Sequence, residues 1–169
     1  MKKLLVILVL LGSINLSQGQ GVFKIGANVG LPAGDASDIS SFVLGADAYY
    51  YFSDPDAMFN IGATVGFRNF FGKEEEFAGI TYEVDDLQFL PLAAAGRFTI
   101  LSTLYAGADV GYALGLTDGL DGGFYVRPVV GIDIANAIEV FLAYDHISVD
   151  NDLGSASLGN LNAGILFEL

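Results

Sequence analysis

From residue 22 onward, apolar residues alternate with polar or small residues with a period of two, in eight separate segments. In LYAGADVGY (104–112), every even-numbered residue is apolar, whereas Gly107, Asp109 and Gly111 lie between them. Successive side chains of a β-strand point to opposite faces, so this period indicates strands with one apolar face. An ionised carboxylate such as Asp109 is costly among apolar groups unless it is paired or hydrated. The alternation therefore predicts strands whose second face meets a polar environment.

The connections between these segments alternate in length. Three of them are short: 53–57, 101–103 and 135–137. The other four are long and polar: 31–41, 72–86, 114–122 and 148–157. Short turns at one end and long polar loops at the other are typical of bacterial outer-membrane β-barrels.

The first 19 residues have the composition of a secretory signal peptide. Two lysines precede an apolar run, 4–11, which is shorter than the about 20 residues that a spanning helix needs. Ser17 and Gly19 are the small residues expected before a cleavage site. We therefore expect a signal peptide at 1–19 and a single exported domain at 20–169.

The exported chain is strongly acidic. The whole sequence has 7 basic and 20 acidic residues, a net charge of −13, and loss of Lys2 and Lys3 makes it −15. This charge excludes nucleic acid as a partner, since phosphate binding needs basic patches. The lack of cysteine excludes disulfides and thiolate metal sites. No EF-hand or Walker-type spacing occurs, so we expect no metal and no cofactor.

Most of the acidic residues lie in the long connections: Asp35, Asp38, Glu74, Glu75, Glu76, Glu83, Asp85, Asp86, Asp118, Asp121, Asp150 and Asp152. Runs of like charge repel one another and stay solvated, which is the interpretation that we favour. Binding of Ca²⁺ by clustered carboxylates is the alternative, because Ca²⁺ prefers oxygen ligands.

The position of the basic residues indicates which face is inside. A soluble barrel such as a lipocalin alternates in the same way, with its apolar face inward. Here four of the five basic residues of the exported chain lie on the polar face: Lys24, Arg68, Arg97 and Arg127. The rest of that face is rich in glycine, which suits a narrow interior. We therefore predict an all-β, transmembrane, eight-stranded antiparallel up-and-down barrel, with a soluble secreted barrel as the alternative.

The predicted interior carries charges of both signs: Lys24, Asp47, Arg68, Arg97, Asp109, Arg127, Asp133, Glu139, Asp145 and Glu168. An eight-stranded barrel is just wide enough for its own side chains, whereas open porins have about 16–18 strands. We therefore expect a structural salt-bridge network, in which Asp109 lies between Arg97 and Arg127. A narrow channel for ions or small solutes is the alternative.

Aromatic residues of the apolar face gather near the strand ends: Phe23, Tyr50, Phe52, Phe59, Phe98 and Phe167 toward the short turns, and Phe67, Tyr112, Phe124 and Tyr144 toward the long loops. Two such bands around an aliphatic zone are typical of the two interfaces of a membrane. We expect these side chains to face lipid.

The segments LPLAAAGRF (90–98), LYAGADVGY (104–112), RPVVGIDIA (127–135) and GILFEL (164–169) resemble the small outer-membrane barrels of the OmpA/OmpX type. The chain is most similar to the outer-membrane β-barrel domain proteins of Bacteroidota. The resemblance implies a Gram-negative outer membrane, periplasmic termini and extracellular long loops. It also implies assembly by the outer-membrane insertion machinery, which recognises an aromatic-bearing last strand such as that of Phe167.

The lone histidine lies in the sequence His146-Ile147-Ser148. A His-x-Ser pair on the outer surface resembles that of the lipid A 3-O-deacylases, which add a glutamate about a dozen residues later. Here Asn160 occupies that region, and an imidazole without a carboxylate partner lacks the group that orients it. A lipid A-modifying enzyme is therefore the lesser alternative. We expect a monomeric, non-enzymatic protein in contact with lipid and lipopolysaccharide, with a structural or surface-interaction role.

Overall fold

A computed structural model describes residues 21–52, 57–77, 80–101, 103–134, 137–151 and 154–169. Within these ranges, 74–83 and 150–155 are described for their backbone only. The predicted signal peptide, 1–19, lies outside the described residues. No helix in the described ranges is long and apolar enough to cross a membrane.

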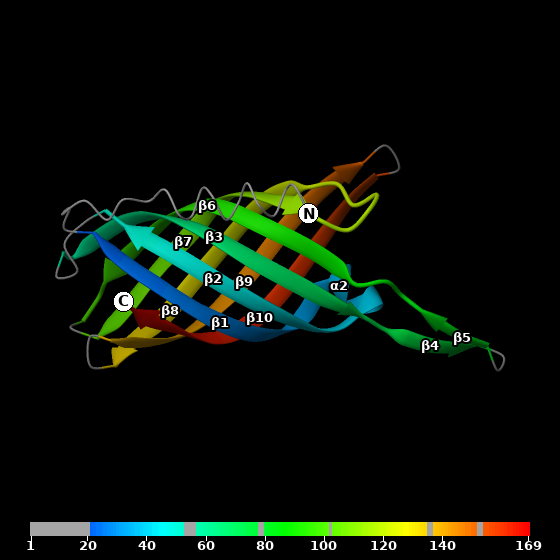
Figure 1. The fold of residues 1–169 in the computed structure, drawn as a ribbon, viewed down its shortest axis with the longest axis horizontal. Coiled ribbons are helices and arrows are strands. Elements are labelled where there is room, and N and C mark those ends of the chain that lie inside the picture. Colours follow the sequence, from blue (N-terminus) through cyan, green and yellow to red (C-terminus); the bar gives the residue numbers. More distant parts are fainter. Residues whose placement is uncertain (1–20, 53–56, 78–79, 102, 135–136, 152–153) are drawn as a thin grey trace.

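Eight strands close into a barrel in the order β1-β10-β9-β8-β7-β6-β3-β2, and every neighbouring pair is antiparallel (Figure 1). The strands are β1 (Val22–Gly34), β2 (Ser40–Tyr51), β3 (Phe59–Gly72), β6 (Leu87–Thr99), β7 (Leu104–Gly115), β8 (Gly123–Ile134), β9 (Ile138–Asn151) and β10 (Gly154–Glu168). The first and last strands close the sheet in a register that runs from Lys24 opposite Glu168 to Gly34 opposite Leu158. The predicted eight-stranded up-and-down fold is confirmed.

Three of the four predicted long loops contain regular structure over much of their length, so those predictions were wrong in part. Within 72–86, β4 (Glu74–Phe77) and β5 (Ile80–Glu83) form a separate two-stranded sheet that projects beyond the barrel (Figure 1). The β9–β10 ladder continues to Asn151 opposite Gly154, through most of the expected loop 148–157. Runs of charged or polar residues interrupt the alternation in both segments, but a hairpin ladder forms through backbone hydrogen bonds, which such residues also supply.

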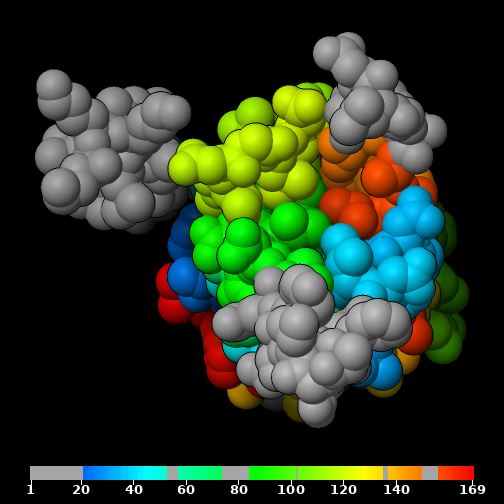
Figure 2. Space-filling view, turned by 90° about the vertical axis from the view of Figure 1, so that its right-hand side faces the viewer, coloured from blue at the N-terminus to red at the C-terminus, as the bar shows by residue number. Residues whose placement is uncertain are grey.

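The first long connection contains a single helical turn, α2 (Ala36–Ile39), at the loop end of the barrel. Ala36 is fully buried there in an apolar cluster with Val43, Phe70 and Ile147. In Figure 2, which looks onto this end, the segments around α2 and around residues 115–122 fill much of the surface. Asp35, the residue before this turn, connects it to β10, since its carboxylate accepts a hydrogen bond from Ser157 N at 2.8 Å.

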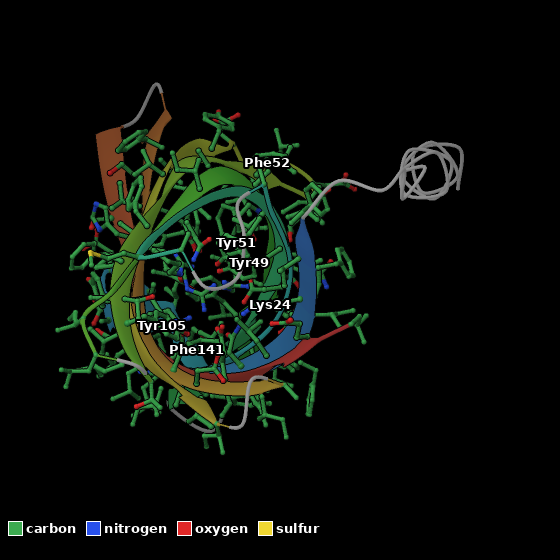
Figure 3. All side chains as sticks on the ribbon, turned by 90° about the vertical axis from the view of Figure 1, so that its left-hand side faces the viewer. Lys24, Tyr49, Tyr51, Phe52, Tyr105 and Phe141 are labelled. Atoms are coloured by element: carbon green, nitrogen blue, oxygen red, sulfur yellow. The ribbon has the colours of Figure 1, made fainter. Side chains whose placement is uncertain are left out.

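The barrel is apolar outside and polar in the middle of its interior. Outward side chains such as Val29, Val130 and Leu142 are more than half exposed on the wall of the barrel. Inside, one apolar cluster fills the short-turn end, where Tyr51 and Phe141 point into the barrel (Figure 3). A second apolar cluster fills the loop end. Buried charged residues occupy the section between the two clusters.

Candidate functional site

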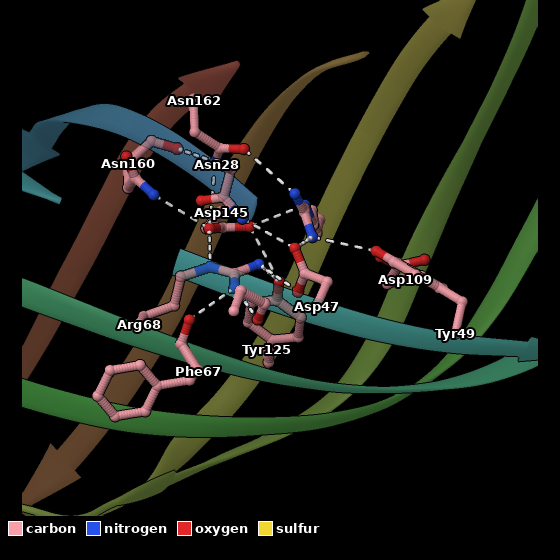
Figure 4. Close-up of polar contacts among 12 residues, drawn as sticks. Asn28, Asp47, Tyr49, Phe67, Arg68, Asp109, Tyr125, Asp145, Asn160 and Asn162 are labelled. Atoms are coloured by element: carbon pink, nitrogen blue, oxygen red, sulfur yellow. Dashed lines mark hydrogen bonds and ion pairs between the residues drawn. The ribbon is translucent and has the colours of Figure 1, made fainter. Parts of the chain in front are cut away.

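Two arginines and two aspartates form a closed ring at the centre of the barrel (Figure 4). Arg68 lies 2.9 Å from Asp47 and 2.7 Å from Asp145. Arg127 lies 2.9 Å from Asp47 and 3.1 Å from Asp145. The positive and negative groups alternate and cancel. Because burying an unpaired charge costs several kcal/mol, this mutual pairing is what permits four ionised groups to occupy a narrow lumen.

Polar neighbours donate further hydrogen bonds to both carboxylates of the ring. Asp145 accepts hydrogen bonds from Tyr125 Oη at 2.9 Å and from the amides of Asn160 and Asn162, each at 3.1 Å. Asp47 accepts one from Asn28 Nδ2 at 2.8 Å. A carboxylate can accept about four hydrogen bonds, so Asp145 is close to fully satisfied.

A second ion pair extends the network toward the short-turn end. Arg97 Nη1 donates to Asp109 Oδ1 at 2.7 Å, and Tyr49 Oη donates to Asp109 Oδ2 at the same distance. Tyr49 Oη in turn accepts from Arg127 Nη1 at 3.0 Å. We expected Asp109 to lie between Arg97 and Arg127. Of the two arginines, only Arg97 forms an ion pair with Asp109 in the structure, and Arg127 is linked to it through the Tyr49 hydroxyl.

The third group of charges lies nearer the short-turn end. Lys24 contacts Glu139 at 2.5 Å and Glu168 at 3.2 Å, which joins β1 to both β9 and β10. Asp133, the second-last residue of β8, lies directly opposite Glu139 in the register of β8 and β9. Figure 3 shows Lys24 inside the barrel, beside Tyr49 and Tyr51. This group is partly exposed, unlike the central ring.

Glycines supply the space that the arginines occupy. A Cβ atom on Gly66 would lie 2.7 Å from Asp47 Oδ1, and one on Gly45 would lie 2.9 Å from Arg68 Nη1. Both distances are shorter than van der Waals contact, so any larger residue at these positions would displace the ring.

Water does not reach the centre of the network. Arg68, Asp109 and Asp145 are 0% exposed, and Arg127 is 1% exposed. Every strand of the barrel contributes to this network: Asn28 from β1, Asp47 and Tyr49 from β2, Arg68 from β3, Arg97 from β6, Asp109 from β7, Tyr125 and Arg127 from β8, Asp145 from β9, and Asn160 and Asn162 from β10. The arrangement can hold the walls of the barrel together, because it joins side chains from every barrel strand.

Five members of this network were not among the residues predicted to form it: Asn28, Tyr49, Tyr125, Asn160 and Asn162. All five share the inward parity of the charged residues in their strands. A search for hydrogen-bonding residues of that parity, and not for charges alone, could have found them.

The ten aromatic residues predicted to face lipid are half-buried or exposed in the structure. The register brings several of them together across neighbouring strands: Phe23 lies opposite Tyr50, and Phe59 opposite Phe98, near the short turns. Toward the loop end, Tyr112 lies opposite Phe124.

Comparisons with known proteins give the fold. No protein-family model and no curated protein matches the sequence. A de novo designed transmembrane β-barrel matches the structure with a TM-score of 0.55 and 10% identity, over 88% of this chain and 95% of that chain. The Yersinia pestis outer-membrane protein Ail in a phospholipid nanodisc matches with a TM-score of 0.53 and 11% identity, over 86% of this chain and 99% of that chain. The crystal structure of Ail matches with a TM-score of 0.52 and 12% identity, over 88% of this chain and 97% of that chain. The chain thus has the fold of small transmembrane β-barrels.

Proposed function

We propose that the protein is a monomeric, non-enzymatic barrel of the Gram-negative outer membrane, with a closed lumen and a structural or surface-interaction role. The observation that carries this proposal is the contrast between the two faces of the wall. The outer face exposes large apolar side chains such as Ile25, Val130 and Leu142, whereas the inner face buries a compensated charge network. Water would favour the opposite arrangement, and lipid favours this one.

The same proposal includes a relationship to the OmpA/OmpX-type and Bacteroidota barrels. It also includes export by the segment 1–19, contact with lipopolysaccharide and assembly by the insertion machinery.

Cell fractionation together with a heat-modifiability gel tests the membrane location. We expect the protein in the outer-membrane fraction, and a change of mobility between unheated and boiled samples. Recovery in the soluble periplasmic fraction would contradict the proposal.

A closed lumen is favoured over a channel because the central ring spans the interior and is excluded from solvent. Arg68 and Arg127 each contact carboxylates of two different strands, so opening a path means breaking several buried ion pairs together. Planar-bilayer recording of the purified protein tests this point. We expect no steady conductance, and ion-selective openings of constant size would instead support a channel.

The His146–Ser148 pair is the feature that would favour an enzyme. His146 Nε2 lies 3.0 Å from Ser148 Oγ, and its Nδ1 lies 3.4 Å from Ser157 Oγ. Asn160 and the neighbouring Asp145 point into the lumen instead, where they bond to one another. The imidazole of His146 thus has hydroxyl partners on both nitrogens, and a hydroxyl stabilises an imidazolium less well than a carboxylate does. Incubation with lipopolysaccharide should release no fatty acid.

A further inference from the structure

Large apolar side chains lie beyond the aromatic band at the short-turn end. Phe59 lies opposite Phe98 in this band. Met58 comes directly before Phe59, whereas Ile100 and Leu101 come directly after the last residue of β6. All three side chains are more than half exposed. Aromatic bands mark the interfaces of a membrane barrel with water, so polar residues are expected past this pair. We call Met58, Ile100 and Leu101 the turn patch.

The turn patch is continuous with the apolar outer wall. Thr99 N donates to Met58 O at 2.9 Å, so Met58 lies beside the end of β6. The segment 98–108, which includes the whole β6–β7 turn, contains no charged residue. The charged residues on either side of it, Arg97 and Asp109, are buried in the barrel and paired with each other. Nothing charged therefore separates the turn from the wall.

Hydrogen bonds also engage the backbone of the β6–β7 turn. Ile100 N donates to Leu104 O at 2.8 Å, and Leu104 N donates to Leu101 O at 3.1 Å. Thr103 O accepts from Asp133 N of β8 at 2.7 Å. In lipid, backbone polar groups need partners within the protein, because no water is present to supply them. These bonds suit the turn to an apolar environment.

The opposite side of the same end is charged. In the closed order of the strands, β6 and β7 lie across the barrel from β10 and β1. Lys24 of β1 forms ion pairs there with Glu168 of β10 and Glu139 of β9, and all three side chains are partly exposed. Figure 3, which looks onto this end, shows Lys24 beside β1. Such groups are costly in hydrocarbon, so this side favours water.

We propose that the β6–β7 turn inserts the turn patch into the apolar region of the lipid leaflet at the short-turn end, so that the barrel leans toward its β6–β7 side. This inference rests on the proposed function for the presence of a bilayer, and it specifies how the barrel lies in that bilayer. Lipid is the occupant because the patch continues the wall that faces acyl chains in the proposed function. Removal of three large apolar side chains from water favours insertion.

The test uses nanodiscs that each hold one barrel, so that only lipid can cover the patch and both faces remain open to reagents. The chain has no cysteine, so Leu101→Cys and Ala137→Cys each introduce a single thiol. Ala137 is exposed, and its carbonyl accepts from Glu168 N at 3.0 Å, which places it on the charged side. An apolar environment raises the pKa of a thiol and lowers the fraction of reactive thiolate. We therefore expect a charged maleimide to label L101C at least about tenfold more slowly than A137C. The two rates should become equal in denaturant.

A second variant tests whether the patch causes the protection. M58S/I100S in the L101C background removes the two apolar neighbours and should raise the labelling rate toward that of A137C. A heat-modifiability gel on each variant reports barrel folding separately. Equal labelling of L101C and A137C in the folded barrel, or slow labelling that persists in M58S/I100S, would overturn the inference.

Val130→Trp in nanodiscs of acyl-brominated lipid separates this inference from the proposed function. Val130 lies in the middle of β8 on the outer wall. Strong quenching at this position together with fast labelling of L101C would overturn the lean of the barrel and leave the membrane location intact. Weak quenching at Val130→Trp would overturn the proposed function and this inference with it.

Discussion

Arg68 Nε donates to Asp145 Oδ2 at 2.7 Å across the full width of the lumen. These residues belong to β3 and β9, which have three strands between them in either direction around the barrel. Arg127 on β8 and Asp47 on β2 are related in the same way. The other two contacts of the ring, Arg68–Asp47 and Arg127–Asp145, join neighbouring strands. The ring therefore joins opposite walls of the barrel twice.

Removal of Asp109 should destabilise the barrel strongly. Asp109→Ala leaves the Arg97 guanidinium buried without its carboxylate, which costs about 3–5 kcal/mol. Thermal or denaturant unfolding in detergent micelles measures the loss. The matched control is Asp118→Ala, which removes an exposed carboxylate in a long connection and should change stability by less than about 0.5 kcal/mol. Equal stability of the two variants would count against a buried, paired Asp109.

Arg97 and Asp109 should be coupled energetically. Arg97→Met and Asp109→Leu each leave one buried charge without its partner, whereas the double variant removes both charges. A buried pair can often be replaced by apolar residues at little cost. A double-mutant cycle should therefore give a coupling free energy at or above about 1 kcal/mol, within the range seen for contacting residues. Additive losses would show that the two side chains do not stabilise each other.

The Tyr49 hydroxyl should stabilise the junction between the ring and the second ion pair. Tyr49→Phe keeps the aromatic ring, which stacks on Tyr51 at 5.7 Å, but removes the group between Arg127 and Asp109. Loss of a partner for buried polar groups costs about 1–3 kcal/mol. Tyr112→Phe, on the outer face, is the control and should be close to neutral. Unfolding of both variants at the same denaturant concentration would contradict this role of the Tyr49 hydroxyl.

Two glycine substitutions should have opposite outcomes. In Gly66→Ala the new methyl group would lie 2.7 Å from Asp47 Oδ1 and 3.1 Å from Arg68 Nη1, so the central ring must shift. Overpacking of this kind costs about 1–3 kcal/mol. In Gly96→Ala the methyl group meets only Ala108 O at 3.9 Å, so the change should be neutral or slightly stabilising. Unfolding midpoints of the two variants decide the matter.

The sequence was sufficient to predict which face of the barrel wall each side chain lies on. It did not predict the position of each side chain along the barrel axis or the partners that it contacts across the lumen. Period-two alternation was sufficient to predict the eight strands, because every strand has one continuous apolar face. Alternation does not reveal that Arg127 forms no ion pair with its register partner Asp109. Arg127 instead pairs with Asp47 on the opposite wall, and this depends on barrel width and strand tilt. It also misses the β4–β5 ribbon, because the acidic run 74–76 interrupts the alternation of apolar and polar residues.

The central claim is that the apolar outer face meets lipid acyl chains. The chain has no tryptophan, so a single one can be placed at Val130, which is 51% exposed in the middle of β8. In vesicles of lipids brominated on the acyl chains, the fluorescence of Val130→Trp should be strongly quenched relative to unbrominated vesicles. Asp118→Trp, in a long connection, should be quenched little. Equal, weak quenching at both positions would contradict the membrane-spanning barrel.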